Sequence, residues 1–315
     1  MQLPRTILTT LAAGTLLLAS GCASDDLAKG DGSQAGTADK GAVSISGQNF
    51  PEATLVASMY DQLLTAKGYD VTVELVGTRD VYSAAGQFPE TIQIVPEYVG
   101  GVVDFLNATA NGPDAPPLTT NDPAASIVAA KSLLADKGIT LLDPSSATDQ
   151  NAFFVTQEYA DANAVTKLSD LEGTSVVLAA APDCLGRSDC EGGLTGVYGI
   201  DITKVLPLGF ASDQTYQSVL DGESQLGLTS TTDGTLADQG LVLLEDDKGI
   251  QPAQNLVPAV STTWLADHQD AADALNALMA ALTTEKLTEL NGRISVDREQ
   301  PEVVAKDFLT SESLI

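Results

Sequence analysis

The sequence predicts an α/β protein built from two domains. Its 315 residues exceed the roughly 100–200 residues of a typical single domain. Short β-branched apolar runs alternate along the chain with longer segments in which apolar residues recur at helical spacing, a pattern typical of strands and helices respectively. One such series precedes residue 150 and a second follows it. Alternating strands and helices are typical of α/β domains.

The first series starts with a strand at 43–46 and a helix that begins near Pro51, because proline suits the first helical turn. Leu55, Met59 and Leu63 recur at intervals of four along one face of this helix, as expected for a buried helical face. The further elements expected before residue 150 are strand 71–76, helix 79–86, strand 92–95, a helix after Tyr98, a proline-containing loop at 111–122, helix 124–137 and strand 139–142.

The second series starts at the apolar run 152–155. The tail at 265–309 is expected to be mostly helical, because Leu275, Leu278 and Leu282 share one helix face. The elements expected between the first strand and this tail are strand 175–179, helices near 191–198 and 213–221, and strands 225–229 and 241–244.

The charge of the chain excludes several function classes. The 43 acidic residues outnumber the 15 basic ones and give a formal net charge of −28, which repels phosphate backbones and anionic lipid headgroups. The single histidine, His268, leaves no histidine pair for a zinc site, and the common nucleotide-binding and hydrolase fingerprints are absent from the sequence. We therefore expect no nucleic acid, no metal, no cofactor and no enzymatic activity. A secreted hydrolase that uses carboxylates and an acidic surface lipoprotein for adhesion or signalling remain as alternatives.

The N-terminus predicts export. Residues 1–21 combine Arg5 with an apolar run at 7–19, which is typical of a secretory signal peptide. The segment Leu18-Ala-Ser-Gly-Cys22 resembles the bacterial lipobox, which implies that Cys22 is lipidated; a plain signal peptide with a bystander cysteine is the alternative. The rest of the segment 22–41, rich in Gly, Ala, Ser and Asp, predicts a flexible tether. The membrane is then contacted only through the N-terminal lipid.

The two remaining cysteines are Cys184 and Cys190. An even pair at this spacing in an exported protein is best explained by a disulfide. Two free thiols are the alternative, and metal binding is disfavoured because no further ligand lies nearby in the sequence. The disulfide would close a short loop that carries Arg187.

Two polar motifs follow predicted strands, where ligands commonly bind in α/β sheets. They are Gln-Asn-Phe-Pro-Glu at 48–52 and Pro-Glu-Tyr-Val-Gly at 96–100. Together with Thr-Thr-Asp-Gly at 231–234, they resemble the Ser-Lys-Asn-Phe-Thr-Glu, Pro-Glu-Tyr-Thr-Gly and Thr-Thr-Asp-Gly motifs of the glycine betaine, choline and carnitine substrate-binding proteins of osmoprotectant ABC transporters. Segments 193–199 and 244–249 support the resemblance, which extends from about residue 42 to the end of the chain.

The resemblance implies a two-lobed type II periplasmic-binding-protein fold with a ligand cleft between the lobes. The chain is expected to cross between lobes near 147–151 and 252–257, so that residues 42–148 and 255–315 form lobe 1 and residues 149–254 form lobe 2. The implied function is that of a monomeric extracytoplasmic receptor, lipid-anchored to the bacterial cell membrane. It would close on a small solute and deliver this solute to the transmembrane subunit of an ABC permease.

The resemblance also implies a ligand site. In the family, a cage of tyrosines holds a quaternary ammonium group through cation–π attraction. The residues implied as ligand contacts are Asn49 and Tyr98 in lobe 1 and Arg187, Thr232 and Asp233 in lobe 2, with Tyr82, Tyr198 and Tyr216 as further aromatic candidates. Alternatively, Asn49 only caps a helix and Tyr98 only fills the core.

Three positions depart from the family motifs, because Gln48 replaces the lysine, Val99 replaces the threonine and Ser230 replaces an aromatic residue often found there. A second hypothesis therefore has the same fold binding an aromatic or polyhydroxylated solute.

Overall fold

The structure is a computed structural model that describes residues 40–315. The expected signal peptide, the lipidated Cys22 and nearly all of the tether lie outside the described residues. The described residues belong to one compact unit. Across residues 40–315, we find no helix with the length and apolarity needed to cross a membrane.

The first of two five-stranded sheets has the strand order β2-β1-β3-β10-β4. Strands β2, β1 and β3 run parallel, whereas β10 is antiparallel to both β3 and β4. The strands are β1 Ala42–Gly47, β2 Asp70–Leu75, β3 Ile94–Tyr98, β4 Ile139–Leu141 and β10 Leu256–Ser261. The N-terminal helices of this sheet are α1 Pro51–Ala66, α2 Arg79–Tyr82, α3 Val99–Asn111, α4 Pro123–Ala129 and α5 Lys131–Lys137.

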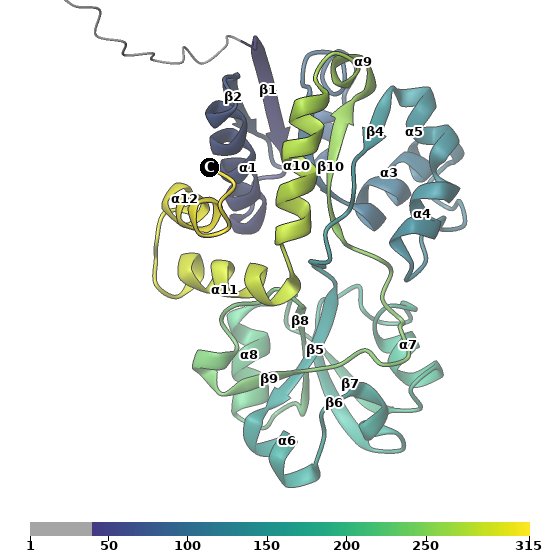
Figure 1. Ribbon diagram of the computed structural model, residues 1–315. Helices are drawn as coiled ribbons and strands as arrows, with labels where there is room; N and C mark the ends of the chain where they lie inside the picture. The colour runs from purple at the N-terminus through teal and green to yellow at the C-terminus, as the bar shows by residue number, and fades with distance from the viewer. Residues whose placement is uncertain (1–39) are drawn as a thin grey trace, which may run out of the picture. The chain divides into compact units, whose positions relative to one another are not determined.

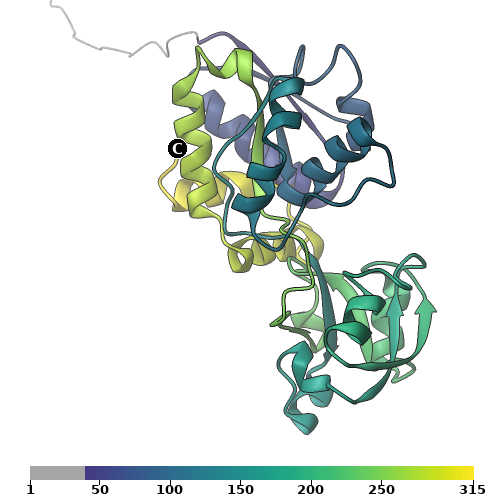
Figure 2. The ribbon, with the colours of Figure 1, turned by 90° about the vertical axis from the view of Figure 1, so that its right-hand side faces the viewer.

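The C-terminal helices return to the first sheet. They are α9 Thr262–Leu265, α10 Gln269–Ala281, α11 Thr284–Ser295 and α12 Pro301–Ser311. Helix α1 packs beside α12 (Figure 1), and a second view shows the same yellow-green segments among the purple and blue elements of this sheet (Figure 2). Apolar residues of α1, α10, α11 and α12 share one hydrophobic cluster with β1. The core of the first sheet is therefore built from both the N-terminal and the C-terminal elements.

The second sheet has the order β7-β6-β8-β5-β9, in which β5 is antiparallel to β8 and β9. Its strands are β5 Asn151–Thr156, β6 Ser175–Ala180, β7 Asp201–Pro207, β8 Leu226–Ser230 and β9 Leu241–Leu244. Its helices are α6 Gln157–Asn163, α7 Glu191–Gly196 and α8 Asp213–Leu220, with 3₁₀ turns at Leu168–Leu171 and Ala237–Gln239. Two mixed sheets with covering helices confirm the predicted α/β class.

Two segments connect the sheets, residues 142–150 (the first crossing) and residues 245–255 (the second crossing). They pair with each other, because Thr148 and Asn255 form an antiparallel bridge. The amide of Asp149 donates to the carbonyl of Gln254 at 3.1 Å, and the amide of Leu256 donates to the carbonyl of Ala147 at 3.0 Å. The lobe boundaries expected at 148/149 and 254/255 lie at this bridge and remain a prediction.

Several elements differ from the sequence-based expectation. Strands β7 and β10 and helix α6 were not expected. Strand β7 is largely exposed and therefore lacks a clean apolar alternation, whereas β10 contains Pro258, and proline is unusual in a central strand. The helix expected at 79–86 ends at Tyr82, and the helix expected at 124–137 is divided at Ala130 into α4 and α5.

The predicted disulfide is confirmed, since Cys184 is bonded to Cys190. Both cysteines are fully buried and belong to the hydrophobic cluster of the second sheet. Their bond fixes the segment between β6 and α7 against that core. The expected alternative of two free thiols is therefore wrong.

Glycine at 227 is required by close packing inside the second sheet. A Cβ atom at Gly227 would lie 2.2 Å from the ring of Phe154, which belongs to the neighbouring strand and is fully buried. We expect Gly227→Ala to lower the free energy of unfolding by about 1–3 kcal/mol, because added volume in a packed core forces neighbours to shift. Gly196→Ala is the matched control, since no atom of the described chain other than its immediate neighbours lies within 4 Å of its Cβ position. Urea unfolding of both variants tests the difference, and equal stabilities would contradict it.

Candidate functional site

Residues from the three motifs meet in one polar cluster. The hydroxyl of Tyr98, at the end of β3, donates to Oε1 of Glu52 in the first turn of α1 at 2.5 Å. Nδ2 of Asn291, on α11, donates both to Oε2 of Glu52 at 2.5 Å and to the carbonyl oxygen of Thr232 at 3.0 Å. The hydroxyl of Thr232 donates to Oδ1 of Asp149 in the first crossing at 3.2 Å. We call Glu52, Tyr98, Asp149, Thr232 and Asn291 the junction cluster, because they belong to elements of both sheets and to a crossing between them.

The junction cluster contains more hydrogen-bond acceptors than donors. Among residues 40–315, no basic side chain forms an ion pair with Glu52 or Asp149. Oδ1 of Asn291 is buried and has no hydrogen-bond partner in the part of the chain that the structure describes. Glu52 is only 5% exposed, so water does not compensate for the missing positive charge. The cluster therefore has an excess of acceptors and of negative charge, which a bound proton or a cationic group would compensate.

Burial and mutual repulsion determine the protonation of this cluster. Burial, followed by the charge of Asp149, raises the pKa of Glu52 from 4.5 to about 7, against the lowering effect of hydrogen bonds from Tyr98, Asn291 and Thr232. Burial also raises the pKa of Asp149. Because two nearby carboxylates share a low-dielectric environment, the pair retains a proton into the neutral pH range.

Tyr82, a predicted aromatic contact, is part of a buried ion-pair network instead of a free ring face. Its hydroxyl donates to Oε1 of Glu97. Arg79 donates to Oε1 of Glu97 from Nε at 2.8 Å and to Oε2 from Nη2 at 2.9 Å, which is the bidentate geometry that suits a buried carboxylate. A Cβ atom at Gly101 would lie 2.4 Å from Nη2 of Arg79. The glycine after the Pro-Glu-Tyr-Val-Gly motif thus makes room for the guanidinium group.

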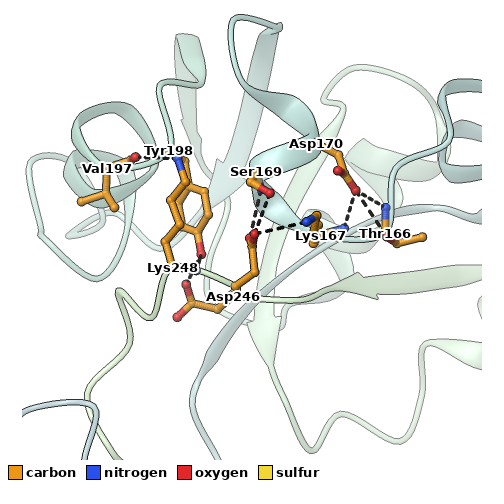
Figure 3. A network of polar contacts seen from close by, with 9 residues as sticks. Thr166, Lys167, Ser169, Asp170, Val197, Tyr198, Asp246 and Lys248 are labelled. Carbon is orange, nitrogen blue, oxygen red and sulfur yellow. Dashed lines mark hydrogen bonds and ion pairs between the residues drawn. The ribbon is translucent and has the colours of Figure 1, made fainter.

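Tyr198, a second predicted aromatic contact, organises the second crossing (Figure 3). Its hydroxyl donates to Asp246 and accepts the amide of Lys248 at 2.7 Å. The other oxygen of Asp246 accepts the amide of Gln251 at 2.9 Å, and Nζ of Lys248 lies 5.2 Å from the centre of the Tyr198 ring. The side chain of Tyr198 is fully buried, so its role in the structure is to hold residues 246–251 in place.

Tyr216 and Asp233 are two predicted contacts that the structure brings together. The hydroxyls of Tyr216 and Thr229 each donate to Oδ2 of Asp233 at 2.6 Å. Oδ1 of Asp233 accepts the amide of Thr235 at 2.9 Å. Asp233 is therefore a connector between α8, β8 and the turn after the Thr-Thr-Asp-Gly motif.

Arg187 lies in the disulfide-closed loop and is neutralised locally. Its guanidinium pairs with Asp183 at 2.8 Å and with Asp189 at 2.5 Å. Nδ2 of Asn151, at the start of β5, donates to Asp189 at 3.1 Å. Arg187 is thus linked through Asp189 to the strand that follows the first crossing.

Asn49 is exposed and does not cap α1, because the N-cap position is Phe50 and no side chain caps the helix. The ring of Phe50 stacks on that of Tyr98, with centroids 6.3 Å apart and planes inclined by 25°. Tyr98 is buried in the main hydrophobic cluster, as the core alternative expected, and it also joins the junction cluster through its hydroxyl. Asn49 and Phe50 therefore lie at the chain's approach to that cluster.

The structure connects Tyr98 with Thr232 through Glu52 and Asn291. It does not gather the four predicted tyrosines, because each belongs to a different hydrophobic cluster and donates its hydroxyl to a different carboxylate. Tyr98 lies in the main hydrophobic cluster, which contains α1. Tyr82 packs with apolar residues of α3, Tyr198 with those of β6, and Tyr216 with those of α8.

Sequence reasoning missed three members of the junction cluster. Glu52 is the last residue of the Gln-Asn-Phe-Pro-Glu motif, and Asp149 lies in the crossing expected near 147–151. The sequence therefore contains a signal for both residues. Asn291 lies 239 residues from its partner Glu52, and no motif marks it.

Two cavities lie beside the second crossing and share Asn121, Gly249 and Gln251 in their walls. The first has a volume of about 560 Å³ and includes Gln150 and Thr231, and the second has a volume of about 480 Å³. The charged residues in their walls are all acidic: Glu245, Asp246 and Glu285 in the first, Asp104 and Asp189 in the second. Both cavities therefore favour neutral or positively charged occupants. Across residues 40–315, no three His, Cys, Asp or Glu side chains are placed to hold a metal ion.

The Tyr198 hydroxyl should contribute measurably to stability. We expect Tyr198→Phe to lower the free energy of unfolding by about 1–3 kcal/mol, because the amide of Lys248 loses its acceptor in a buried setting. Tyr159→Phe is the matched control, since Tyr159 packs on the same core and its hydroxyl has no hydrogen bond within the described part of the chain. Urea unfolding measures both; a similar loss in the control would contradict this role.

The buried Glu52 should make stability depend on pH. The folded protein binds more protons than the unfolded chain between pH 4.5 and about 7, so the free energy of unfolding should fall as the pH rises through this window and level off above it. We expect Glu52→Gln to flatten this slope and to stabilise the protein by roughly 2 kcal/mol at pH 8. Exposed Glu90 provides the control variant Glu90→Gln, which should keep the wild-type slope. Denaturant unfolding from pH 5 to 8 checks this, and an unchanged slope in Glu52→Gln would refute it.

Comparisons with known proteins agree with the motifs. Residues 41–311 match the family described as the substrate-binding domain of the ABC-type glycine betaine transport system. The chain is 28% identical over 292 residues to the glycine-betaine-binding protein of Pseudomonas aeruginosa, which covers 89% of this chain and 91% of that relative.

Among solved structures, a glycine betaine/carnitine/choline ABC transporter protein is similar with a TM-score of 0.73 at 22% identity, covering 86% of this chain and 99% of that one. Apo YehZ from Escherichia coli is similar with a TM-score of 0.71 at 24% identity, covering 87% and 99%. These two structures confirm the type II periplasmic-binding-protein fold. With the family match over residues 41–311, the chain belongs to the substrate-binding domains of ABC-type glycine betaine transport systems.

Proposed function

We propose that this protein is a monomeric, lipid-anchored receptor that captures a small solute by closure of two lobes and delivers it to the permease of an ABC importer. Substrate-binding proteins of ABC importers are extracytoplasmic, bind small solutes and work with permease subunits, and their family is not an enzyme family.

The observation that carries this proposal is the junction cluster. Residues of three sequence motifs, contributed by elements of both sheets, meet beside the paired crossings. A receptor with this arrangement responds to its solute when the solute contacts both lobes, because those contacts favour the closed state. The paired crossings at Thr148 and Asn255 are short connections about which such a closure would turn.

A cationic or zwitterionic solute of the glycine betaine, choline or carnitine type fits the charge of the site. The cavities beside the second crossing have acidic walls without lysine or arginine. The half-buried ring of Phe50, which stacks on the buried ring of Tyr98, supplies an aromatic surface to which a quaternary ammonium group is attracted. Exposed Asn49 is our candidate for a polar contact with the other end of the solute.

An aromatic or polyhydroxylated solute is the second candidate, and a specific observation favours it. The hydroxyls of Tyr82, Tyr198 and Tyr216 are all engaged by carboxylates in separate clusters. A complete aromatic cage would need these rings in one place. Amide and hydroxyl groups in the cavity walls, such as Asn121, Gln150 and Thr231, suit a ligand that makes several hydrogen bonds.

Calorimetry distinguishes these ligands. We expect glycine betaine, choline, carnitine or proline betaine to release or absorb heat on binding, and Phe50→Ala to weaken that binding about tenfold because it removes an aromatic partner of the cation. Phe210→Ala is the matched control, since Phe210 is 47% exposed and lies in the segment between β7 and α8. An absence of heat with all four solutes at millimolar concentration would overturn the first ligand class. Weaker binding in the control as well would overturn the role of Phe50.

A further inference from the structure

Glu52 is a buried carboxylate and Asp149 a half-buried one in the same network, and no lysine or arginine of residues 40–315 forms an ion pair with either. We propose that they form a proton-binding site, and that the proton bound there controls the arrangement of the junction between the two sheets. This inference rests on the proposed function only in its consequence for solute capture. The site itself is argued from the contacts of the junction cluster.

The position of the pair makes it sensitive to movement between the sheets. Glu52 is on α1 and Asp149 is in the first crossing, next to the Thr148–Asn255 bridge. Nδ2 of Asn291 donates to both Glu52 and the carbonyl of Thr232, and the hydroxyl of Thr232 donates to Asp149. A change of charge on either carboxylate therefore acts on contacts that join elements of both sheets.

The described groups that surround Glu52 and Asp149 are neutral or negative, so a bound proton is the positive charge that can compensate this pair. Strand β3 contributes Tyr98 and Glu97, α11 contributes Asn291, and the segment around the end of β8 contributes Ser230 and Thr232. Glu97 is negative and holds the guanidinium of Arg79 in a bidentate pair. Arg79 is thus already engaged and does not neutralise Glu52 or Asp149. Neither carboxylate lies in the walls of the two cavities described above, so a proton suits this position better than a solute does.

A bound proton repairs two defects of the cluster. It removes the repulsion between the carboxylates, and it supplies a donor where Oδ1 of Asn291 and the carboxylate oxygens provide a surplus of acceptors. Loss of the proton leaves two negative charges in a poorly solvated environment. The individual hydrogen bonds from Asn291 and Thr232 favour the charged carboxylates. Burial and mutual repulsion oppose two charges at this position, so the arrangement that brings Glu52 close to Asp149 is favoured when the pair holds a proton and disfavoured when it does not.

This protonation gives the receptor a pH response. The raised pKa of Glu52, about 7, places the change between mildly acidic and mildly alkaline conditions. A solute that favours one arrangement of the two lobes then changes the number of bound protons by up to one, because linkage between two ligands is reciprocal. The receptor would sense external pH together with its solute.

A distance measurement without any solute tests the site. Spin labels on cysteines introduced at the exposed positions Lys131 and Thr195, in a chain carrying Cys22→Ser and retaining the disulfide, report the separation of the two sheets by pulsed electron paramagnetic resonance. We expect the distance distribution to change between pH 5.5 and 8.5 with a midpoint near 7. Glu52→Gln should show the acidic distribution at both pH values, because its amide imitates the protonated carboxyl, and Glu90→Gln should behave as the wild type.

A pH-independent distribution in the wild-type background, or an unchanged response in Glu52→Gln, would overturn the proposal. If Glu52→Gln fails to fold, as judged by its thermal unfolding, Asp149→Asn replaces it with the same expectation. Calorimetry with glycine betaine in two buffers of different ionisation enthalpy then measures proton exchange on binding. If glycine betaine gives no heat, the ligand assignment fails while the distance measurement still decides the proton site.

Discussion

A shortage of cations is the constraint on which this structure depends. With 43 acidic and 15 basic residues, most carboxylates cannot be paired with lysine or arginine, yet Glu52 and Glu97 are buried and others, such as Asp233 and Asp246, are half-buried. The structure solves this with phenol hydroxyls, which form strong charge-assisted hydrogen bonds to carboxylates without adding charge. The pairs are Tyr69–Asp270, Tyr82–Glu97, Tyr98–Glu52, Tyr198–Asp246 and Tyr216–Asp233. Asp270 and Glu97 also have a cation partner, Lys40 and Arg79 respectively.

These tyrosine–carboxylate pairs connect distant segments of the chain. Tyr98 joins β3 to α1, Tyr198 fixes the second crossing, and Tyr216 joins α8 to the turn after β8. A hydroxyl that already donates to a buried carboxylate keeps its ring in one rotamer and in one cluster. Aromatic content in this acidic protein therefore serves packing and polar satisfaction, which explains why four conspicuous tyrosines do not assemble into one cage.

The junction between the sheets is where this solution is least complete. Glu97 has both Tyr82 and Arg79, whereas Glu52 has Tyr98 and Asn291 and faces the charge of Asp149. An incompletely compensated acid is costly in a rigid core. At a junction between two lobes the same acid has a use, since its protonation state can be linked to lobe movement. The cost of the pair and its proposed role have the same physical origin.

The sequence by itself determined the local elements and the chemistry that depends on spacing. Periodicity located β1 and α1 because their apolar residues face one core, and the paired cysteines in an exported chain predicted the Cys184–Cys190 bond. The motifs identified the family through residues that are near one another along the chain. Local patterns could not reveal β7, which is an exposed edge strand, or β10, in which Pro258 argues against a central strand.

Only the tertiary structure decided the contacts between distant segments. The contact of Asn291 with Glu52 spans 239 residues, and Asp149 meets Thr232 across 83 residues. No periodicity records such a pairing, because it depends on how α11 and the two crossings fold back on the motifs. The same is true of the tyrosines, whose residue type suggested a cation site. Whether a phenol ring faces a solute or satisfies a buried carboxylate depends on which acid the fold places beside its hydroxyl.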